Sequence, residues 1–461
     1  MRTGVARWRA GLAGVVLLAA ATSVTFVVLV PPYESPDEHA HVEYVRQVAL
    51  HGLPREIPPF GAPERRFVYE WVQPPLYYVL AAPLALAAGA SAPTILTPDP
   101  SSRLLGGPRW VVYSHERPLD PPELARRLYL LRAFGVLLAA LCVIATVLLT
   151  RAVSGSDRAS LLAGAALALV PQWTAIMSSA ANDGLATTLS AWAVLALWPL
   201  VAVQTAGWAV TAGLLAGLAL STKLTAACVI PGLLYALWST QTTRRVQLGA
   251  AALAALAMAG GWPFAWNLVA HGDLLASAFK RAALEAGGFT GAAGSVPGPF
   301  DPGFWRYVVV MVVEPFWARF GSLGAGLAAG SRGWGVYFAL TACVALAIVS
   351  GSVASWTAEK RRGPAERSRR QLAQALTVTV ACGLLLWLGA NVVNPSAMVV
   401  HWTPRHVMPL TASLVALGAL GAVRAAAWLP RSARHLLGWP LLAVLAGLWL
   451  IVVRDVAAAF R

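Results

Sequence analysis

Apolar runs of about 20 residues recur from one end of this sequence to the other, and they constrain its fold more than any other feature. A helix of this length can cross the hydrocarbon core of a bilayer. The runs do not alternate apolar with polar residues, as the strands of a membrane barrel do. The pattern therefore predicts an all-α, polytopic bundle of about eleven membrane-spanning helices.

The distribution of charge supports this fold class and argues against nucleic acid as a partner. The formal net charge is +15, but charged residues fill only 12% of the 461 positions, and the basic ones are scattered between apolar runs. Cytoplasmic loops of membrane proteins carry such an excess of Lys and Arg. We therefore expect a multi-pass protein of the plasma (inner) membrane, with Arg2, Arg7 and Arg9 on the cytoplasmic side.

This orientation gives one membrane domain over residues 1–461 with two long sections outside. The first, residues 31–123, carries a short interfacial helix over residues 35–52 and a second apolar helix near residues 79–90, which is interfacial or re-entrant. The second external section covers residues 267–332. The four cysteines fall inside apolar runs without metal-ligand spacing, so we expect neither a disulfide framework nor a metal site from them.

The motif Ser-Pro-Asp-Glu-His-Ala-His, residues 35–41, follows directly after the first apolar run and is the best candidate for a reactive site. Ser35 fits an N-cap, Pro36 the first helical position and Glu38 a capping box. Asp37 is then free either to complement the helix dipole or to accept a proton or bind a cation. His39 and His41 point to different helix faces, which argues against zinc.

The other polar signatures gather on the same, outer side, and ionisable groups at such helix ends mark function in membrane proteins. Each has a structural alternative: Lys223 could snorkel to the interface, Arg405 could pair with an external acid, and Asn182 with Asp183 could cap a helix. Carboxylates on early loops and cations on later ones suit a reaction between a proton-bearing acceptor and a phosphate. The candidate site residues are Asp37, Glu38, Gln73, Tyr77, Asn182, Asp183, Lys223, Arg319, Arg405 and His406.

These residues, in this order, resemble the GT-C superfamily of membrane glycosyltransferases, which includes protein O-mannosyltransferases, aminoarabinose transferases and mycobacterial arabinosyltransferases. The likeness rests on motifs spread over most of the chain. They are Pro36-Asp37-Glu38, Gln73-Pro74-Pro75-Leu76-Tyr77-Tyr78, Asn182-Asp183, Thr222-Lys223, His271-Gly272-Asp273 and Arg405-His406-Val407-Met408-Pro409.

The resemblance implies a hexosyl- or pentosyltransferase of the cell envelope that moves a sugar from a polyprenyl-phosphate donor to an acceptor hydroxyl, with inversion. The acceptor would be a glycan, lipid or protein of the cell wall or envelope, on the outer side. Asp37, with Glu38, would supply the catalytic base, and Lys223, Arg405 and His406 would hold the donor phosphate. Gln73, Tyr77, Asn182, Asp183 and Arg319 would contact substrate. The sequence requires no cofactor, and some superfamily members bind a divalent metal at the acidic loop.

This sequence departs from many relatives at Gln73, where they have His or Glu-Lys, which weakens any phosphate contact from that loop. Two other functions compete with the transferase. A lipid-linked saccharide ligase or polymerase would use Arg405 and His406 on a pyrophosphate donor. A proton-coupled transporter or flippase would use Asp37 or Asp183, but it predicts internal repeats and acids near the bilayer midplane, and neither is evident.

Overall fold

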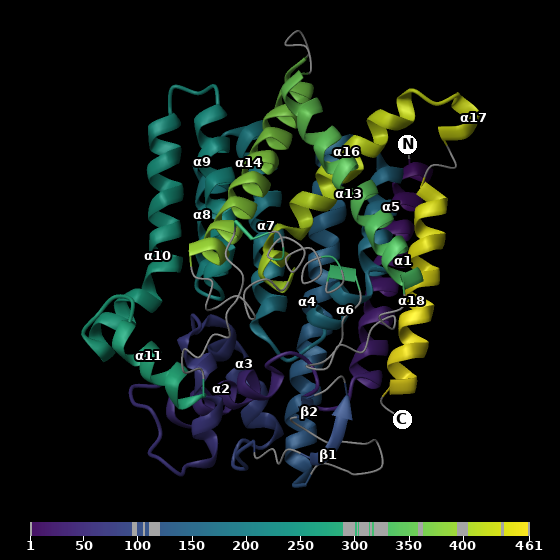
Figure 1. Ribbon diagram of the computed structural model, residues 1–461. Coiled ribbons are helices and arrows are strands. Elements are labelled where there is room, and N and C mark those ends of the chain that lie inside the picture. Colours follow the sequence, from purple (N-terminus) through teal and green to yellow (C-terminus); the bar gives the residue numbers. More distant parts are fainter. Residues whose placement is uncertain are drawn as a thin grey trace.

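The computed structural model describes residues 2–94, 99–104, 107–109, 120–288, 300–301, 303, 313, 316–317, 331–357, 363–393, 404–434 and 438–459. Within these ranges the protein is an all-α bundle of mostly long helices running between two ends (Figure 1). The prediction of a polytopic helical membrane protein is confirmed. Arg319 lies outside the described residues.

Eight helices are long and apolar enough to cross a membrane, and a bent helix pair raises this number to nine within the described chain. The pair is α5 (Asp157–Ala168) and α6 (Pro171–Met177), which meet at 73° because Pro171 starts a new helix. The long helices are α1 (Arg2–Leu29), α4 (Pro122–Ser154), α7 (Asn182–Val203), α10 (Arg245–His271), α13 (Ser331–Thr357), α14 (Pro364–Val393), α16 (Thr411–Ala427, extended by the 3₁₀ turn η4, Pro404–Leu410) and α18 (Gly438–Ala459).

Two segments expected as spans are shorter than the membrane, which accounts for the difference from the predicted eleven. They are α8 (Ala206–Leu220) and the continuous pair η2 (Leu224–Val229) and α9 (Ile230–Ser239). A helix of 15 residues is about 22 Å long, against about 30 Å of hydrocarbon. Short elements complete the fold: α11 (Ser277–Ala286), at the end of the bundle that carries the first loop, and α17 (Arg431–Arg434), at the opposite end (Figure 1).

The loop between α1 and α4 forms a compact cap at the lower end of the bundle in Figure 1. It contains α2 (Glu38–His51), the 3₁₀ helix η1 (Pro63–Val72), α3 (Leu76–Ala88) and a small antiparallel ribbon of β1 (Asp99–Leu104) and β2 (Gly107–Arg109). Most of α2 is buried, including the polar Glu43 and Arg46, because it packs against η1, α3 and α4. It is therefore a core element of the cap and not the half-exposed interfacial helix that we expected.

Buried charges fasten this cap to α4. Arg46 donates to Glu43 at 2.7 Å, and Glu43 also accepts from the backbone N–H of Thr94 at 3.0 Å. Arg127, fully buried near the start of α4, donates to the carbonyl of Ala92 at 3.0 Å and to the Thr94 hydroxyl at 3.2 Å. Buried charges persist only when they are paired and hydrogen-bonded, so these contacts hold the loop in one position.

The helices α13 and α16 approach one another through two glycines. A Cβ at Gly421 would lie 2.0 Å from the carbonyl oxygen of Ala347, and one at Gly351 would lie 2.0 Å from that of Leu417. Small residues at such crossings let backbones touch, which is how membrane helices gain packing energy without a hydrophobic driving force. This contact fixes one wall of the groove described below.

Candidate active site

The site is organised around the residue that precedes α2. Asp37 has a left-handed backbone (φ 56°, ψ 9°), and α2 begins at Glu38. No side chain caps this helix, so the predicted capping box with Ser35 as N-cap is wrong. Asp is among the few non-glycine residues that adopt this conformation, and such strain persists where the surroundings impose it.

The Asp37 carboxylate is held by residues from two distant parts of the chain. Its Oδ2 accepts a hydrogen bond from the guanidinium of Arg405, on η4, and its Oδ1 accepts from the Tyr69 hydroxyl at 3.3 Å. The side chain remains 26% exposed. Burial disfavours the charged form, but the Arg405 guanidinium, together with His41 and His39, outweighs it and holds the pKa of Asp37 well below its usual range. Asp37 is thus ionised and reachable.

Glu38, the next residue, has a different environment. Its oxygens accept two bonds from Arg132 of α4, at 2.9 and 2.6 Å, and two from the backbone N–H groups of Tyr33 and Ala180, at 3.1 and 3.0 Å. The side chain is completely buried. With these four bonds its acceptor capacity is filled, so Glu38 joins the end of α1, the start of α2, α4 and the α6–α7 turn.

Two histidines and a second buried carboxyl surround Asp37. His39 Nε2 lies 2.9 Å from the Tyr69 hydroxyl. His41 Nδ1 lies 2.8 Å from the Tyr78 hydroxyl and 3.6 Å from Oε2 of Glu70, an atom that has no hydrogen-bond partner among the described residues.

Burial favours the neutral forms of both buried groups in this contact. It lowers the pKa of His41 to about 3, and burial together with the charge of Asp37 raises the pKa of Glu70 to about 8. At neutral pH the contact therefore joins two uncharged groups. Sequence reasoning missed Glu70 and Tyr69, although a Glu two residues before Val72 in an aromatic stretch was visible.

A second ion pair lies next to this group. Lys223 Nζ is 2.7 Å from Asp183 Oδ1, and the two side chains are only 6% and 2% exposed. Asn182, fully buried at the start of α7, donates to the carbonyl of Thr222 at 3.2 Å and makes no capping bond. Lys223 therefore does not snorkel. Its charge and that of Arg405 both act on His41, so the two cations serve one site.

The remaining candidates lie at the margins of this group. Tyr77 is 1% exposed, with its ring stacked on Phe134. Gln73 is half-buried and lines a small cavity with Tyr44 and Trp71. His406 follows Arg405 on η4 and is also half-buried. Among the described residues, no group of three or more His, Cys, Asp or Glu side chains is arranged to hold a metal.

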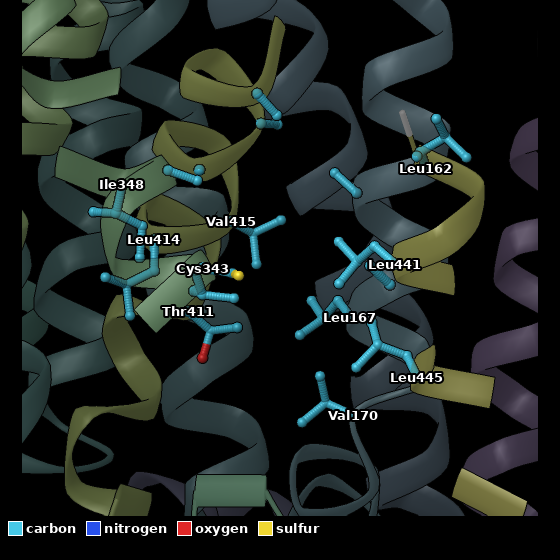
Figure 2. Close-up of a pocket in the computed structure, with 18 of the residues that line it drawn as sticks. Leu162, Leu167, Val170, Cys343, Ile348, Thr411, Leu414, Val415, Leu441 and Leu445 are labelled. Carbon is cyan, nitrogen blue, oxygen red and sulfur yellow. The ribbon is translucent and has the colours of Figure 1, made fainter. Parts of the chain in front are cut away.

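An apolar groove runs through the bundle and reaches the site at Arg405. It encloses about 670 Å³ between α5, α13, α16 and α18, and residues 407–427 line it over about 30 Å of helix. Its walls face one another across open space (Figure 2). The labelled residues are Leu162, Leu167, Val170, Leu441 and Leu445 on one wall, and Cys343, Ile348, Thr411, Leu414 and Val415 on the other.

The groove suits a long apolar ligand with an anionic end. Its length matches the hydrocarbon thickness of a bilayer, and most of its lining is apolar. Arg405 at one end contacts Asp37, while Arg158 and Arg434 line the other end. A lipid lying in the groove would present its head group to the Asp37–Arg405 pair.

Comparison with known proteins agrees with this geometry. Residues 127–264 match the sequence model of the dolichyl-phosphate-mannose-protein mannosyltransferase family. This match covers less than a third of the chain. No curated protein matches the sequence. The fold resembles that of an oligosaccharyltransferase from Archaeoglobus fulgidus with a tethered acceptor peptide, at 14% identity and a TM-score of 0.51, covering 97% of this chain and 55% of that one.

At this identity the likeness to the oligosaccharyltransferase is one of fold. Two further solved structures are similar to this chain at lower TM-scores. The S. cerevisiae Pmt1-Pmt2 O-mannosyltransferase bound to its sugar donor shares 19% identity over 57% of this chain and 33% of its own, at 0.40. ArnT from Cupriavidus metallidurans bound to undecaprenyl phosphate shares 17% over 91% and 81%, also at 0.40. The chain thus spans about half the length of the oligosaccharyltransferase and a third of the mannosyltransferase.

Proposed function

We propose that this protein transfers a hexosyl or pentosyl group from a polyprenyl-phosphate donor to a hydroxyl of a cell-envelope glycan, lipid or protein. The observation that carries the proposal is the position of Arg405, which lines the apolar groove and also contacts the partly exposed carboxylate of Asp37. A lipid-binding groove that ends at a cation beside an available base is what such a reaction needs.

The proposed reaction uses Asp37 as general base. Asp37 takes the proton of the acceptor hydroxyl while that oxygen bonds to the anomeric carbon and the bond from this carbon to the phosphate oxygen breaks. The electron pair of that bond passes to the phosphate, and attack from the face opposite the leaving group inverts the anomeric centre. General-base help of this kind contributes about 10²- to 10⁴-fold.

Arg405 has two roles in this scheme. Its guanidinium stabilises the negative charge that develops on the phosphate. The neighbouring His406 and the positive charge of Lys223 add to this stabilisation. Because a phosphate competes with Asp37 for the same guanidinium, donor binding also frees the carboxylate and raises its basicity. Donor binding would thus activate the base.

The other residues are proposed to position these groups. Glu38 holds the start of α2 through Arg132, and the Lys223–Asp183 pair with Asn182 holds the start of α7. Gln73, Tyr77 and Arg319 remain proposed substrate contacts. We propose that the charges of Arg405 and Lys223 suffice without a metal; activity lost in EDTA and restored by Mn²⁺ would contradict this.

The test is transfer of labelled sugar by the purified protein in liposomes, with a panel of polyprenyl-monophosphate and polyprenyl-pyrophosphate sugars. The expected result is turnover of a monophosphate donor that Asp37→Asn abolishes. Glu56→Gln is the matched control, because Glu56 is an exposed carboxylate of the same loop. Consumption of pyrophosphate donors alone would instead indicate the ligase or polymerase.

A second pair of variants tests the groove. Cys343 of α13 lines it, whereas Leu346 of the same helix is 70% exposed and does not. Cys343→Trp should raise the KM for a long-chain donor by about tenfold or more, because the indole fills space that the lipid needs. Leu346→Trp should leave KM unchanged, and a donor with a short prenyl chain should be insensitive to both. Equal effects of the two variants would exclude the groove.

The proposed outward orientation is tested separately. Phe60, between α2 and η1, is 96% exposed at the same end as Asp37. In a background without native cysteines, Phe60→Cys should react with a membrane-impermeant maleimide in intact cells, whereas Arg244→Cys at the opposite end should react only after lysis. The reverse result would place the site in the cytoplasm.

A further inference from the structure

A second large cavity lies at the opposite end of the bundle from Asp37. It encloses about 590 Å³ between the end of α4, the ends of α13 and α16, and the first turns of α14. In Figure 1 this is the upper end, where α14 starts. The active-site groove and this cavity share only one described lining residue, Val423, so they are separate spaces.

The cavity is lined by four arginines, which we call the arginine pocket: Arg367, Arg369, Arg370 and Arg424. Among its described lining residues Glu366 is the one acid. The four guanidiniums therefore exceed the acid by about three positive charges at neutral pH, since Arg stays protonated.

The guanidiniums are held in place by the fold. Arg367 donates to Gln241 at 2.7 Å, and Nε of Arg370 donates to the Ser355 carbonyl at 3.2 Å. Arg369 lies against Gly155 at the end of α4, where a Cβ would come within 2.5 Å of its Nη1. Its Nε is buried and has no hydrogen-bond partner among the described residues. A buried charged donor that lacks a partner costs free energy, which a ligand in the cavity would recover.

The simplest alternative is that these arginines only reflect the basic side of a membrane protein. Arg244, at the same end, has that character: it is exposed and its side chain makes no hydrogen bond among the described residues. The arginine pocket differs because its side chains line one cavity, which also has an apolar part, Ala354, Leu420 and Val423.

We propose that the arginine pocket binds a phosphate-bearing ligand, with the phosphate on Arg369 and Arg424 and an apolar portion on Leu420 and Val423. Basic pockets between membrane helices have the chemistry to hold anionic lipid head groups, and planar guanidiniums bind phosphate in a bidentate manner. The same chemistry could come from a phospholipid of this leaflet or from a soluble phosphate ester. This site is independent of the proposed glycosyl transfer.

The test is native mass spectrometry of the purified protein after equilibration with phosphatidylglycerol, cardiolipin or phosphatidylcholine. The wild type should retain an anionic lipid in preference to phosphatidylcholine. Arg369→Gln with Arg424→Gln should weaken that retention by about tenfold or more, because each variant removes a charge-assisted contact. Arg244→Gln is the matched control and should bind as the wild type does. Unfolding temperatures of all three proteins verify that the variants fold.

A second arm identifies the source of the phosphate. Glycerol 3-phosphate and inorganic phosphate are titrated against lipid-stripped protein by calorimetry. Binding of the soluble esters with the same dependence on Arg369 and Arg424 supports the site with a soluble ligand, and binding of phospholipid alone supports a lipid. The proposal is overturned if neither class binds, or if the double variant binds both as tightly as the Arg244→Gln control.

Discussion

Asp37 and Glu38 are neighbours in the chain, and each pairs with an arginine, yet the two pairs have opposite characters. Glu38 and Arg132 are completely buried, and the glutamate oxygens accept four hydrogen bonds. Asp37 is a quarter exposed, and its arginine, Arg405, belongs to the wall of the lipid-sized groove. The first pair holds four parts of the fold together, whereas the second is reached by solvent and lies beside the groove.

The largest effect is expected on stability, when the buried pair of Glu38 and Arg132 is broken. Arg132→Leu leaves the Glu38 charge without its partner, and breaking a buried ion pair costs about 3–5 kcal/mol. We expect little folded protein and a strongly lowered unfolding temperature in detergent. Arg405→Leu is the comparison variant and should fold almost normally, since solvent reaches Asp37. Equal destabilisation by the two variants would refute the contrast drawn here.

A second effect concerns the exposed pair. Arg405→Gln should lower kcat/KM by about 10²- to 10³-fold, the usual loss when one charge-stabilising donor is removed. It should also raise the pKa of Asp37, because the charge of Arg405 no longer counteracts the effect of burial on that pKa. The acidic limb of the pH–rate profile should therefore move to higher pH. Arg405→Lys should retain part of both properties. An acidic limb that stays in place would show that Arg405 does not act on the base.

The third effect concerns Glu70, a buried carboxyl that, unlike Asp37 and Glu38, is not paired with an arginine. Burial raises the pKa of Glu70 from 4.5 to about 8, so the folded state binds a proton that the unfolded state has released. Stability should therefore fall with rising pH across this interval, by up to about 1.4 kcal/mol per pH unit.

The titration of His41 limits the pH range in which this effect of Glu70 can be measured. Burial lowers its pKa from 6.5 to about 3, so its contribution to stability increases with pH below 6.5 and opposes that of Glu70 there. Between pH 6.5 and 8 Glu70 acts without this opposition. Unfolding temperatures measured across that range should decline for the wild type and stay level for Glu70→Gln. Parallel curves would contradict a protonated Glu70.

The smallest effect concerns the hydroxyl that links Asp37 to His39. Tyr69→Phe removes its bonds to both, at 3.3 and 2.9 Å, and each bond is worth about 0.5–1.5 kcal/mol. We expect a several-fold loss of kcat with an unchanged KM for the donor. Tyr78→Phe, which removes the bond to His41 instead, should affect stability more than kcat. The opposite ranking would place Tyr78 nearer to the chemistry.

The sequence predicted the bundle because hydrophobic runs of membrane length have few alternative folds. It also predicted that Asp37, Asp183, Lys223 and Arg405 gather at one end, since the sidedness of spans follows from charge. It did not predict which carboxylate each cation would contact. Arg132 was overlooked because it lies within an apolar run, although an arginine at such a position is itself a signal of a buried partner.

Helix-capping rules gave the wrong prediction at Asp37, the proposed base. Ser35, Pro36 and Glu38 fit a capping box, but Glu38 instead joins Arg132, and Asp37 takes a left-handed conformation. A cap bond contributes about 1 kcal/mol, and the buried ion pair with its hydrogen bonds outweighs it. The long-range contact that decides between these options is not visible in a short motif.

Asp37 and Arg405 are separated by 368 positions in the chain. A ribosome that delivers helices to the membrane in order therefore produces Asp37 early and its partner only after most of the bundle has been inserted. Until then the aspartate lacks the guanidinium that lowers its pKa, and the groove lacks the wall that α16 supplies. The Asp37–Arg405 contact therefore forms late in synthesis, after the helices between the two residues have been made.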